Sequence, residues 1–434
     1  MCYLRQVNPQ HGAFDLVIVG AGAAGLAGAI FAAEAAKGRN LRILIIEGAK
    51  KPGAKILVSG GGRCNVTNER VTQYDFWGGS RAIIRNVLAQ FDDRKARQWF
   101  EEMGVELKLE PSGKYFPVTN QARTVLEALL ARVESLGIRI WTGTRVVGIA
   151  RSAEEYSLAL SDGQTLAARR VIVATGGLAL PKSGSDGAGL SMMRALGHTI
   201  VPTTPALTPL VLQKSRSLGG RFAEFTGVAL DARLMLFRKG HEKPDVVLED
   251  PLLFTHLGLS GPVAMNMSRH WLRRRLEECN DHATLCLGLP QFRSIADADA
   301  WLFEQTRVSP ARRLSGVLAA LYPERVAIAV AGDGGEDMIM SQLTLPRRQH
   351  VARCLAMLPL DVIGVRDYTC AEATAGGVDL REIEYNTMES RKTPGLFLCG
   401  EILDVDGRIG GFNFQWAWSS GYVAGRGAAR SLTL

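Results

Sequence analysis

Residues Asp15–Gly25 (DLVIVGAGAAG) constrain the fold of this chain more than any other segment. An apolar run enters a Gly20-x-Gly22-x-x-Gly25 turn, and the next apolar run (RILII) ends at Glu47. This order predicts a strand, a tight turn, a helix and a second strand, which is the βαβ unit that binds dinucleotides. Gly20 permits the sharp turn, Gly22 lets the backbone approach a pyrophosphate, and Gly25 lets the helix pack on the strand. The helix N-terminus would face the phosphates, and Glu47 would accept hydrogen bonds from ribose hydroxyls.

Two later strand ends indicate which dinucleotide binds. Val171–Gly177 (VIVATGG) is another apolar run that enters a glycine turn. Gly395–Gly400 (GLFLCG) is a third, followed by Glu401 and by Gly410-Gly411 at the start of the last expected helix. Strand ends that meet from such distant positions imply a long ligand. NAD needs no C-terminal return of this kind, whereas FAD must also have its ribityl chain and its ring held. We therefore predict that FAD is the cofactor.

Longer motifs extend beyond this fingerprint. They are Ser59–Asn68 (SGGGRCNVTN), ATGG with the following PKSGSDGAG, Thr255–Pro262 (THLGLSGP), Thr374–Val378 (TAGGV), Thr387–Ser390 (TMES) and GEILDVDGRIGGFNFQWAWSSG. From Phe14 to Arg426, the chain resembles the BaiN/YhiN-like family of NAD(P)/FAD-dependent oxidoreductases. The resemblance implies a two-dinucleotide flavoprotein fold with an inserted barrel and a helical region, non-covalent FAD, and redox chemistry on a small substrate. The family's roles range from steroid-like enone reduction to amine oxidation, so the resemblance leaves the substrate open.

Composition favours a soluble, cytoplasmic, multidomain enzyme. A chain of 434 residues, 47% of them hydrophobic, is too long for one core. No apolar run reaches the roughly 18 residues that span a bilayer, and the N-terminal MCYLRQVNPQHG does not have the pattern of a secretory signal. Seven cysteines without a CxxC pair favour reduced thiols and disfavour a dithiol–disulfide reductase. No zinc-like ligand spacing predicts a metal.

The sequence predicts an α/β fold with a Rossmann-type FAD-binding domain of the two-dinucleotide flavoprotein kind. An inserted β-barrel-like domain and a small helical domain interrupt it. The predicted ranges are 1–197 and 371–434 for the FAD-binding domain, 198–290 and 358–370 for the β-rich domain, and 291–357 for the helical one.

Backbone groups and a few side chains make up the predicted cofactor site. Gly60–Gly62 can bring N–H groups against the pyrophosphate or the flavin N5 edge. Glu401 can accept hydrogen bonds from ribityl hydroxyls, and N–H groups of Gly410–Gln415 can face the N1–C2=O edge, where negative charge accumulates in the reduced ring. The full predicted set is Gly20, Gly22, Ala23, Ala24, Gly25, Glu47, Gly48, Lys55, Ser59, Gly60, Gly61, Gly62, Arg63, Asn65, Val146, Val147, Ala174, Thr175, Gly176, Gly177, Gly400, Glu401, Gly410, Gly411, Phe412, Asn413, Phe414 and Gln415.

Three side chains are predicted to serve the reaction. Arg63, His256 and Tyr115 lie in or beside the family motifs and are expected to border the isoalloxazine ring. For His256, a structural histidine is an equally good interpretation. Cys64 fits a small buried residue under the glycine loop better than a redox group. The role of Arg408 cannot be carried over, because its position varies in the family.

These features predict an FAD-dependent oxidoreductase that moves a hydride through flavin N5 to or from a small organic substrate. NADH or NADPH is the expected transient donor. The insertion at 198–370 would form the wall opposite the ring, with Thr255-His256 facing it. Two alternatives stay open, namely an amine-type oxidase that uses dioxygen and a nucleic-acid-binding or regulatory flavoprotein without turnover.

The net charge of +8 does not by itself indicate a nucleic-acid partner. Arg273-Arg274-Arg275 is followed at once by Leu276-Glu277-Glu278, and Arg347-Arg348 is equally short. Both runs predict solvated helix faces rather than a basic stripe. We expect a small-molecule partner, and we expect neither a metal, a membrane nor a nucleic acid.

The first testable prediction concerns the cofactor. Purified protein should be yellow and should release FAD on heat denaturation, because Glu47 and the Gly20 turn serve only an adenosine diphosphate half. Chromatography of the released chromophore checks this. FMN in the supernatant, or a colourless protein that FAD does not reconstitute, contradicts it.

Overall fold

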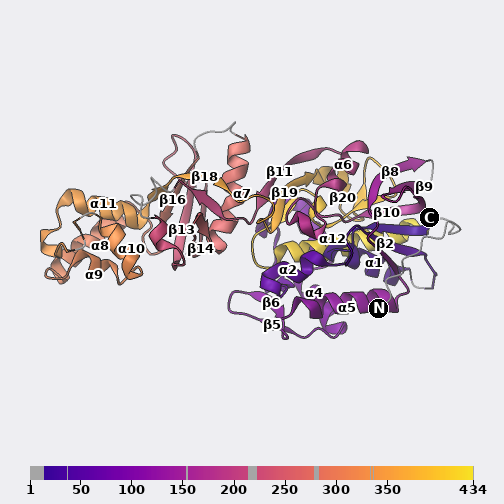
Figure 1. Cartoon of the computed structure of the whole chain (residues 1–434), viewed down its shortest axis with the longest axis horizontal. Helices are drawn as coiled ribbons and strands as arrows, with labels where there is room; N and C mark the ends of the chain where they lie inside the picture. The colour runs from indigo at the N-terminus through magenta and orange to yellow at the C-terminus, as the bar shows by residue number, and fades with distance from the viewer. Residues whose placement is uncertain are drawn as a thin grey trace. The chain divides into compact units, whose positions relative to one another are not determined.

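A computed structural model describes residues 14–36, 38–152, 155–213, 222–277, 283–332, 334–335 and 337–433. The chain divides into two compact units. The first combines the segment up to Thr204 with the segment from Glu372 onward, and the second is Pro205–Ala371. In Figure 1 the indigo N-terminal and yellow C-terminal segments lie together in the first unit, around helices α1 and α12.

The first unit is built on a sheet whose central strands run parallel. Its order is β20-β21-β22-β10-β1-β2-β7, and β8 and β9 form a hairpin beside β10. The bounds are β1 Phe14–Val19, β2 Ile43–Glu47, β7 Arg139–Thr142, β8 Val146–Ser152, β9 Glu155–Leu160, β10 Thr165–Val173, β20 Ile383–Glu384, β21 Glu389–Ser390 and β22 Leu396–Leu398. Because β22, β10, β1, β2 and β7 are mutually parallel, their carboxyl ends share one edge of the sheet.

Three small sheets complete the first unit's strand content. They are β3-β6-β5 (Thr67–Asn68, Lys114–Pro117, Leu107–Leu109), β23-β4 (Val405–Gly407, Phe76–Gly78) and β11-β19 (Ile200–Ala206, Ala373–Val378). The helices are α1 Ala23–Ala35, α2 Ala54–Gly62, α3 Arg81–Gln90, α4 Asp93–Glu102, α5 Ala122–Ser135, α6 Ala188–Ala195 and α12 Phe412–Ser431.

Helix α1 is buried because its side chains are small and apolar (AAGLAGAIFAAEA) and α12 packs closely on it. A Cβ at Gly421 would lie 2.8 Å from the Ala24 oxygen, and one at Gly425 would lie 2.2 Å from the Gly28 oxygen. The two backbones therefore approach more closely than any larger residue allows.

The second unit contains a seven-stranded antiparallel sheet of order β17-β16-β13-β14-β15-β12-β18. The bounds are β12 Leu210–Leu212, β13 Ala229–Phe237, β14 Val246–Phe254, β15 Gly258–Ser260, β16 Thr284–Gly288, β17 Leu358–Leu360 and β18 Val362–Val365. β17 and β18 are the first and last strands of this sheet, and only Asp361 separates them in the chain. The two edges of the sheet are therefore close together, and the sheet has a barrel-like form. The helices are α7 Pro262–Glu277, α8 Ile295–Val308, α9 Leu314–Leu318, α10 Glu324–Ala331 and α11 Leu345–Ala356.

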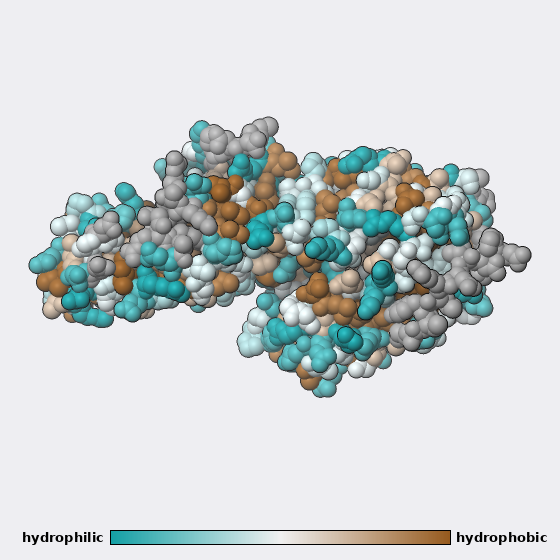
Figure 2. Space-filling model, in the orientation of Figure 1, coloured by the Kyte–Doolittle hydropathy of each residue, from teal (hydrophilic) through white to brown (hydrophobic). Residues whose placement is uncertain are grey.

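The faces visible in Figure 2 carry hydrophilic residues with hydrophobic patches among them. Among the described residues, no helix combines the length and apolarity needed to cross a bilayer. Within those same ranges, no group of three or more His, Cys, Asp or Glu side chains is arranged to hold a metal ion.

His198 is the centre of a buried polar network in the first unit. Its Nδ1 lies 2.9 Å from Glu382 Oε2, and its Nε2 lies 2.9 Å from Ser390 Oγ. Burial lowers the pKa of His198, and the hydrogen bond from its ring to Glu382 opposes this only in part. Burial alone would raise the pKa of Glu382, but hydrogen bonds from Lys392, Thr199 and His198 lower it to about 2. The network therefore holds a neutral imidazole against a charged carboxylate.

This network predicts a pH-dependent stability. Unfolded His198 takes up a proton near its ordinary pKa of about 6.5, whereas the folded residue resists protonation until lower pH. The free energy of unfolding should therefore fall as the pH drops from 7 toward the lowered pKa, by up to about 1.4 kcal/mol per pH unit for one proton. Glu382 stays ionised throughout this window. Urea titrations at several pH values measure the slope, which His198→Gln should reduce and the exposed-site control His241→Gln should not. An unchanged slope in His198→Gln contradicts the prediction.

Candidate cofactor site

The three fingerprint glycines occupy different environments at the carboxyl edge of β1. Gly20 has a φ of +105° and donates its N–H to the Ile46 oxygen at 2.8 Å. A Cβ at Gly25 would lie 1.9 Å from the Gly20 oxygen, whereas a Cβ at Gly22 would have no heavy atom within 4 Å. Gly20 and Gly25 are therefore required by the fold, and Gly22 borders open space. Because the first N–H groups of a helix have no acceptor within it, α1 directs free donors into this space.

Glu47 ties the end of β2 to the glycine turn. Its Oε2 accepts from the Ala21 N–H at 2.7 Å, and its Oε1 accepts from the Ala49 N–H at 2.8 Å. Each carboxylate oxygen has a second lone pair, so both can still accept ribose hydroxyls.

Gly48, Val146 and Val147, which were predicted to bind the cofactor, lie beside Glu47 or beside Arg145 in the chain. A Cβ at Gly48 would lie 3.4 Å from Arg145 Nε, and Arg145 pairs with Asp186 at 2.5 Å. Val146 and Val147 follow Arg145 on β8, with Val146 buried and Val147 exposed. Sequence reasoning missed Arg145 and Asp186, because nothing in either residue's local pattern marks it.

The second and third predicted strand ends converge on the same edge. A Cβ at Gly177 would lie 2.5 Å from Thr374 Oγ1 and 3.1 Å from Glu401 Oε1. Thr374 Oγ1 accepts from the N–H groups of Leu178 and Ala179 at 2.8 and 3.0 Å. A Cβ at Gly400 would lie 2.7 Å from the Ala24 Cβ on α1. Thr374, in the TAGGV motif, therefore fixes the turn after β10, a role that sequence reasoning did not give it.

Glu401 is the polar centre of this convergence. One carboxylate oxygen forms an ion pair with Lys55 on α2, and the other accepts from the Thr374 N–H at 2.9 Å. The side chains of both ion-pair partners are largely buried. Three separate chain segments therefore meet at one carboxylate beside Gly177.

The glycine loop at the end of α2 is an exposed strip of backbone. Gly60, Gly61 and Gly62 have φ values of +55°, +68° and +83°, and all three are exposed. Cys64 lies buried below them, its N–H bonded to the Ser59 oxygen at 3.1 Å. Burial raises the pKa of the Cys64 thiol to about 12, although Ser59 partly opposes this. Cys64 is therefore a neutral packing residue.

Asn65 lies between the glycine loop and the turn before α12. A Cβ at Gly60 would lie 3.2 Å from the Asn65 nitrogen, and one at Gly411 would lie 2.9 Å from Asn65 Oδ1. Asn65 is buried, and its Oδ1 has no hydrogen-bond donor among the described residues. Such a buried acceptor costs about 1–3 kcal/mol when unsatisfied. A ligand N–H group would satisfy it.

The start of α12 offers its backbone rather than its side chains. Asn413 Oδ1 accepts from the Gly407 N–H at 2.8 Å, and Asn413 Nδ2 donates to the Gly407 oxygen at 3.0 Å. Phe414 stacks on Trp418 with ring centroids 5.5 Å apart. Gln415 is fully buried, where it accepts from Thr67 Oγ1 and donates to the Phe91 oxygen. Phe412 is buried as well. These side chains hold the helix in place, and its first N–H groups remain available to a ligand.

Each of the three predicted catalytic residues has its own surroundings. Arg63 lies 3.9 Å over the Phe116 ring and pairs with Glu110 at 2.7 Å. The Tyr115 hydroxyl accepts from Arg97 Nη1 at 2.8 Å. Because successive residues of a strand point to opposite faces, Arg63 and Tyr115 lie on opposite faces of β6. His256 is exposed in the turn between β14 and β15 of the second unit.

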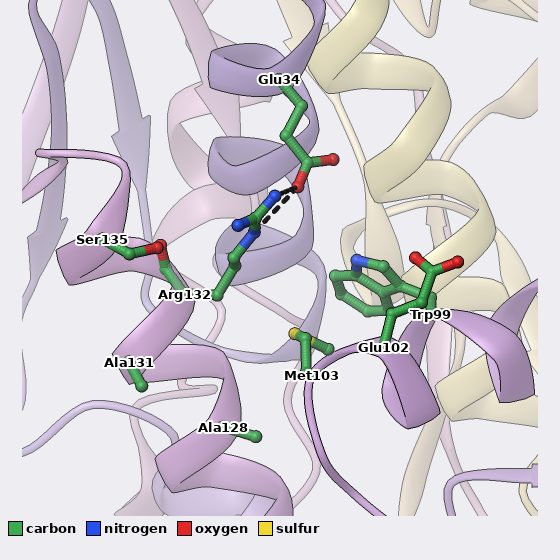
Figure 3. Close-up of a pocket in the computed structure, with 8 residues that line it drawn as sticks. All are labelled: Glu34, Trp99, Glu102, Met103, Ala128, Ala131, Arg132 and Ser135. Carbon is green, nitrogen blue, oxygen red and sulfur yellow. Dashed lines mark hydrogen bonds and ion pairs between the residues drawn. The ribbon is translucent and has the colours of Figure 1, made fainter.

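A surface hollow of about 330 Å³ lies elsewhere in the first unit, lined by residues of α1, α4 and α5. Figure 3 shows Arg132 of α5 reaching Glu34 of α1, where Nε and Nη2 both donate to Glu34 Oε1 at 3.0 and 2.6 Å. Glu34 is eleven residues beyond Ala23, roughly 16 Å along the helix from the glycine turn. None of the predicted cofactor residues lines this hollow.

The parallel sheet, its glycine turn and the carboxylates at its edge define a Rossmann-type flavoprotein, an FAD-dependent oxidoreductase. The HI0933-like protein Rossmann domain family matches residues 14–427, so the chain belongs to this family. This confirms the resemblance, fold class and enzyme class predicted from the sequence.

Two relatives match almost end to end. A ribosomal RNA dihydrouridine synthase of Escherichia coli (strain K12) is 32% identical over 411 residues, which cover 94% of this chain and 96% of that protein. A 3-dehydro-bile acid delta(4,6)-reductase of Clostridium scindens is 33% identical over 418 residues, covering 95% and 98%. Among solved structures, the FrdA chain of E. coli quinol fumarate reductase superposes with a TM-score of 0.50 at 18% identity, covering 97% of this chain and 71% of that one. This last likeness concerns the fold.

Because Gly22 borders open space, replacing it tests whether the Gly20–Gly25 turn is the cradle that binds the FAD pyrophosphate. Gly22→Val should fold normally, since no protein atom lies within 4 Å of the new Cβ, but its side chain should fill the pyrophosphate position and leave the protein without FAD. Glu47→Ala should weaken FAD binding roughly 10- to 100-fold, from the loss of charged hydrogen bonds of about 1.5–3 kcal/mol. FAD content per protein is read from the absorbance spectrum.

The matched control is Gly364→Val, on β18 of the second unit, where a Cβ also meets nothing within 4 Å. It should keep its FAD. Equal FAD retention in all three variants would show that the Gly20–Gly25 turn is not the cradle.

Proposed function

We propose that this protein uses FAD to reduce a carbon–carbon double bond conjugated to a carbonyl group, with NADH or NADPH as the transient electron donor. The names of the two relatives have this chemistry in common. Dihydrouridine is uridine with hydrogen added across a ring double bond conjugated to a carbonyl, and the bile acid name describes reduction of double bonds conjugated to a 3-oxo group. For each double bond that is reduced, one hydride and one proton convert C=C into CH–CH.

The site residues fit FAD in three independent ways. The space beside Gly22 lies at the N-terminus of α1, where a pyrophosphate would accept free N–H groups. The carboxylates of Glu47 and Glu401 can accept hydroxyls of the ribose and of the ribityl chain. The unsatisfied Asn65 Oδ1 can accept a ring N–H. When FAD is bound and reduced, its N5 supplies the hydride.

The observation that carries the proposal is the position of Arg63. It follows Gly60–Gly62 directly, and its guanidinium is fixed by the Phe116 ring below it and by Glu110 at its Nη1. The guanidinium has five N–H donors, so others remain for a substrate. A donor that points at a conjugated carbonyl oxygen stabilises the negative charge that develops there as the hydride reaches the β-carbon. We assign no step to Tyr115, because it lies on the opposite face of β6.

Anaerobic mixing tests this function against an oxidase and against a flavoprotein without turnover. NADH or NADPH should bleach the flavin absorption band, and a conjugated enone such as 2-cyclohexenone should restore it, whereas the saturated ketone should not. Bleaching by a simple amine, with hydrogen peroxide formed on admitting air, would instead show an amine oxidase. A band that no reductant bleaches would contradict every enzymatic function.

Replacing Arg63 tests its role directly. Arg63→Gln should lower kcat/KM for the enone about 100-fold, as expected for the loss of one charge-stabilising donor, while FAD content stays unchanged. Arg63→Lys should keep part of the activity. The control Arg123→Gln removes an exposed arginine of α5 and should have no effect. Loss of FAD in Arg63→Gln, with unchanged kinetics in the remaining holoenzyme, would show that Arg63 only supports the loop.

A further inference from the structure

The turn between β7 and β8 carries Arg145 to the end of β2. The Thr144 N–H donates to the Glu47 oxygen at 3.2 Å. Arg145 exchanges two hydrogen bonds with Ser161, because its N–H donates to Ser161 Oγ at 3.1 Å and its oxygen accepts from the Ser161 N–H at 2.8 Å. All of these bonds use the backbone of Thr144 and Arg145. The position of Arg145 in the fold therefore does not depend on its own side chain.

The loop after β10 reaches Glu47 from a different segment of the chain. A Cβ at Gly184 would lie 3.6 Å from Glu47 Oε1. The loop is anchored at the end of β10, because the Gly187 N–H donates to the Gly177 oxygen at 3.1 Å. Asp186 lies between these two fixed points of the loop. Its carboxylate is therefore mounted on backbone that is already held at the candidate cofactor site.

The ion pair between Arg145 and Asp186 joins the two segments. Arg145 Nη1 lies 2.5 Å from Asp186 Oδ2. A Cβ at Gly48 would lie 3.4 Å from Arg145 Nε, and the Asp186 N–H donates to the Gly184 oxygen at 3.1 Å. Glu47 is therefore flanked by two segments that this pair holds together. The two side chains are 43% and 34% exposed, and an ion pair of this exposure contributes little to the stability of the fold.

The surroundings of Glu47 suit the base of an adenosine. Glu47 can accept ribose hydroxyls, and the adenine ring is bonded to the same ribose, so the ring cannot lie far from this carboxylate. Gly48 and Gly184 have no side chains and leave room for a planar group. Arg145 supplies the side chain at this place, and its planar guanidinium can stack on an aromatic face.

We propose that Arg145 binds the adenine ring of FAD and that Asp186 is its positioning residue, so that the pair governs how fast FAD is released. A free arginine side chain has many rotamers, and ordering it on binding costs free energy. Because Asp186 already fixes the guanidinium, much of this cost is avoided when the cofactor binds. The inference rests on FAD as the cofactor in the proposed function and does not depend on which substrate is reduced.

The rate at which oxidised holoprotein releases FAD, followed after dilution by the fluorescence of free flavin, tests the proposal. Arg145→Gln should release FAD at least tenfold faster, because it removes the guanidinium. Asp186→Asn should release it at least threefold faster, and its amide oxygen can still accept from the Ala188 N–H as Asp186 Oδ1 does at 3.2 Å. The double variant should release FAD no faster than Arg145→Gln alone, because Asp186 acts through Arg145.

The matched control is Arg132→Gln, which breaks the pair that Arg132 Nη2 forms with Glu34 Oε1 at 2.6 Å. The Arg132 side chain is 42% exposed, close to the exposure of Arg145. Its pair borders the hollow on α1, α4 and α5, where none of the predicted cofactor residues lies. This control should release FAD like the unmodified protein. The FAD-free forms of all variants should unfold at the same temperature, because both ion pairs are exposed.

Three results would overturn the proposal: unchanged release in Arg145→Gln, equal acceleration in Arg132→Gln, or effects of Arg145→Gln and Asp186→Asn that multiply in the double variant. Multiplied effects would show that each residue only supports its own loop. The measurement uses neither a reductant nor an enone, so a failure of enone reduction contradicts the proposed function alone. A protein that binds no FAD contradicts both.

Discussion

The site depends on the close packing of α1 against β1 on one side and α12 on the other. A Cβ at Gly25 would lie 1.9 Å from the Gly20 oxygen, and one at Gly425 would lie 2.2 Å from the Gly28 oxygen, so only glycine fits at these crossings. The small side chains of α1 make this approach possible. Its result is that the N-terminus of α1 is fixed at the carboxyl edge of the sheet, with its free N–H groups facing the space beside Gly22. The ends of the other parallel strands meet around this point.

Two carboxylates then link these strand ends to one another. Glu47 accepts from the N–H groups of Ala21, which follows β1, and Ala49, which follows β2. Glu401 forms an ion pair with Lys55 and accepts from the Thr374 N–H. Because these groups hold loops from distant parts of the chain, the same side chains both shape the cofactor cradle and remain able to accept hydroxyls from it. Replacing either residue should therefore affect folding and FAD binding together, which is why Gly22, with no contacts of its own, is the cleaner probe.

Much of the cradle could be predicted because its determinants are local. A glycine turn after an apolar run specifies Gly20, Gly22 and Gly25 through backbone sterics alone. Arg63 and Tyr115 were predicted to border one ring; Arg63 lies over Phe116 and Tyr115 accepts from Arg97, and these contacts between distant segments are not contained in the short run KYFP. Gln415 lies in the family motif but is fully buried and hydrogen-bonded to Thr67 and Phe91, so the motif there reflects packing.

The sequence by itself determined the class of fold, the dinucleotide fingerprint and which apolar runs end in a glycine turn. These follow from periodicity and from glycine positions, which act over a few residues. Only the tertiary structure decided which charges are cancelled and which stay free. Arg274 and Arg348, prominent as basic runs, are paired with Asp245 and Asp299. Within the described ranges, Arg81 has no such ion pair and lies with its guanidinium carbon 5.4 Å from the centroid of the Tyr74 ring. Ion pairing depends on distances between segments far apart in the chain, and a linear pattern does not contain those distances.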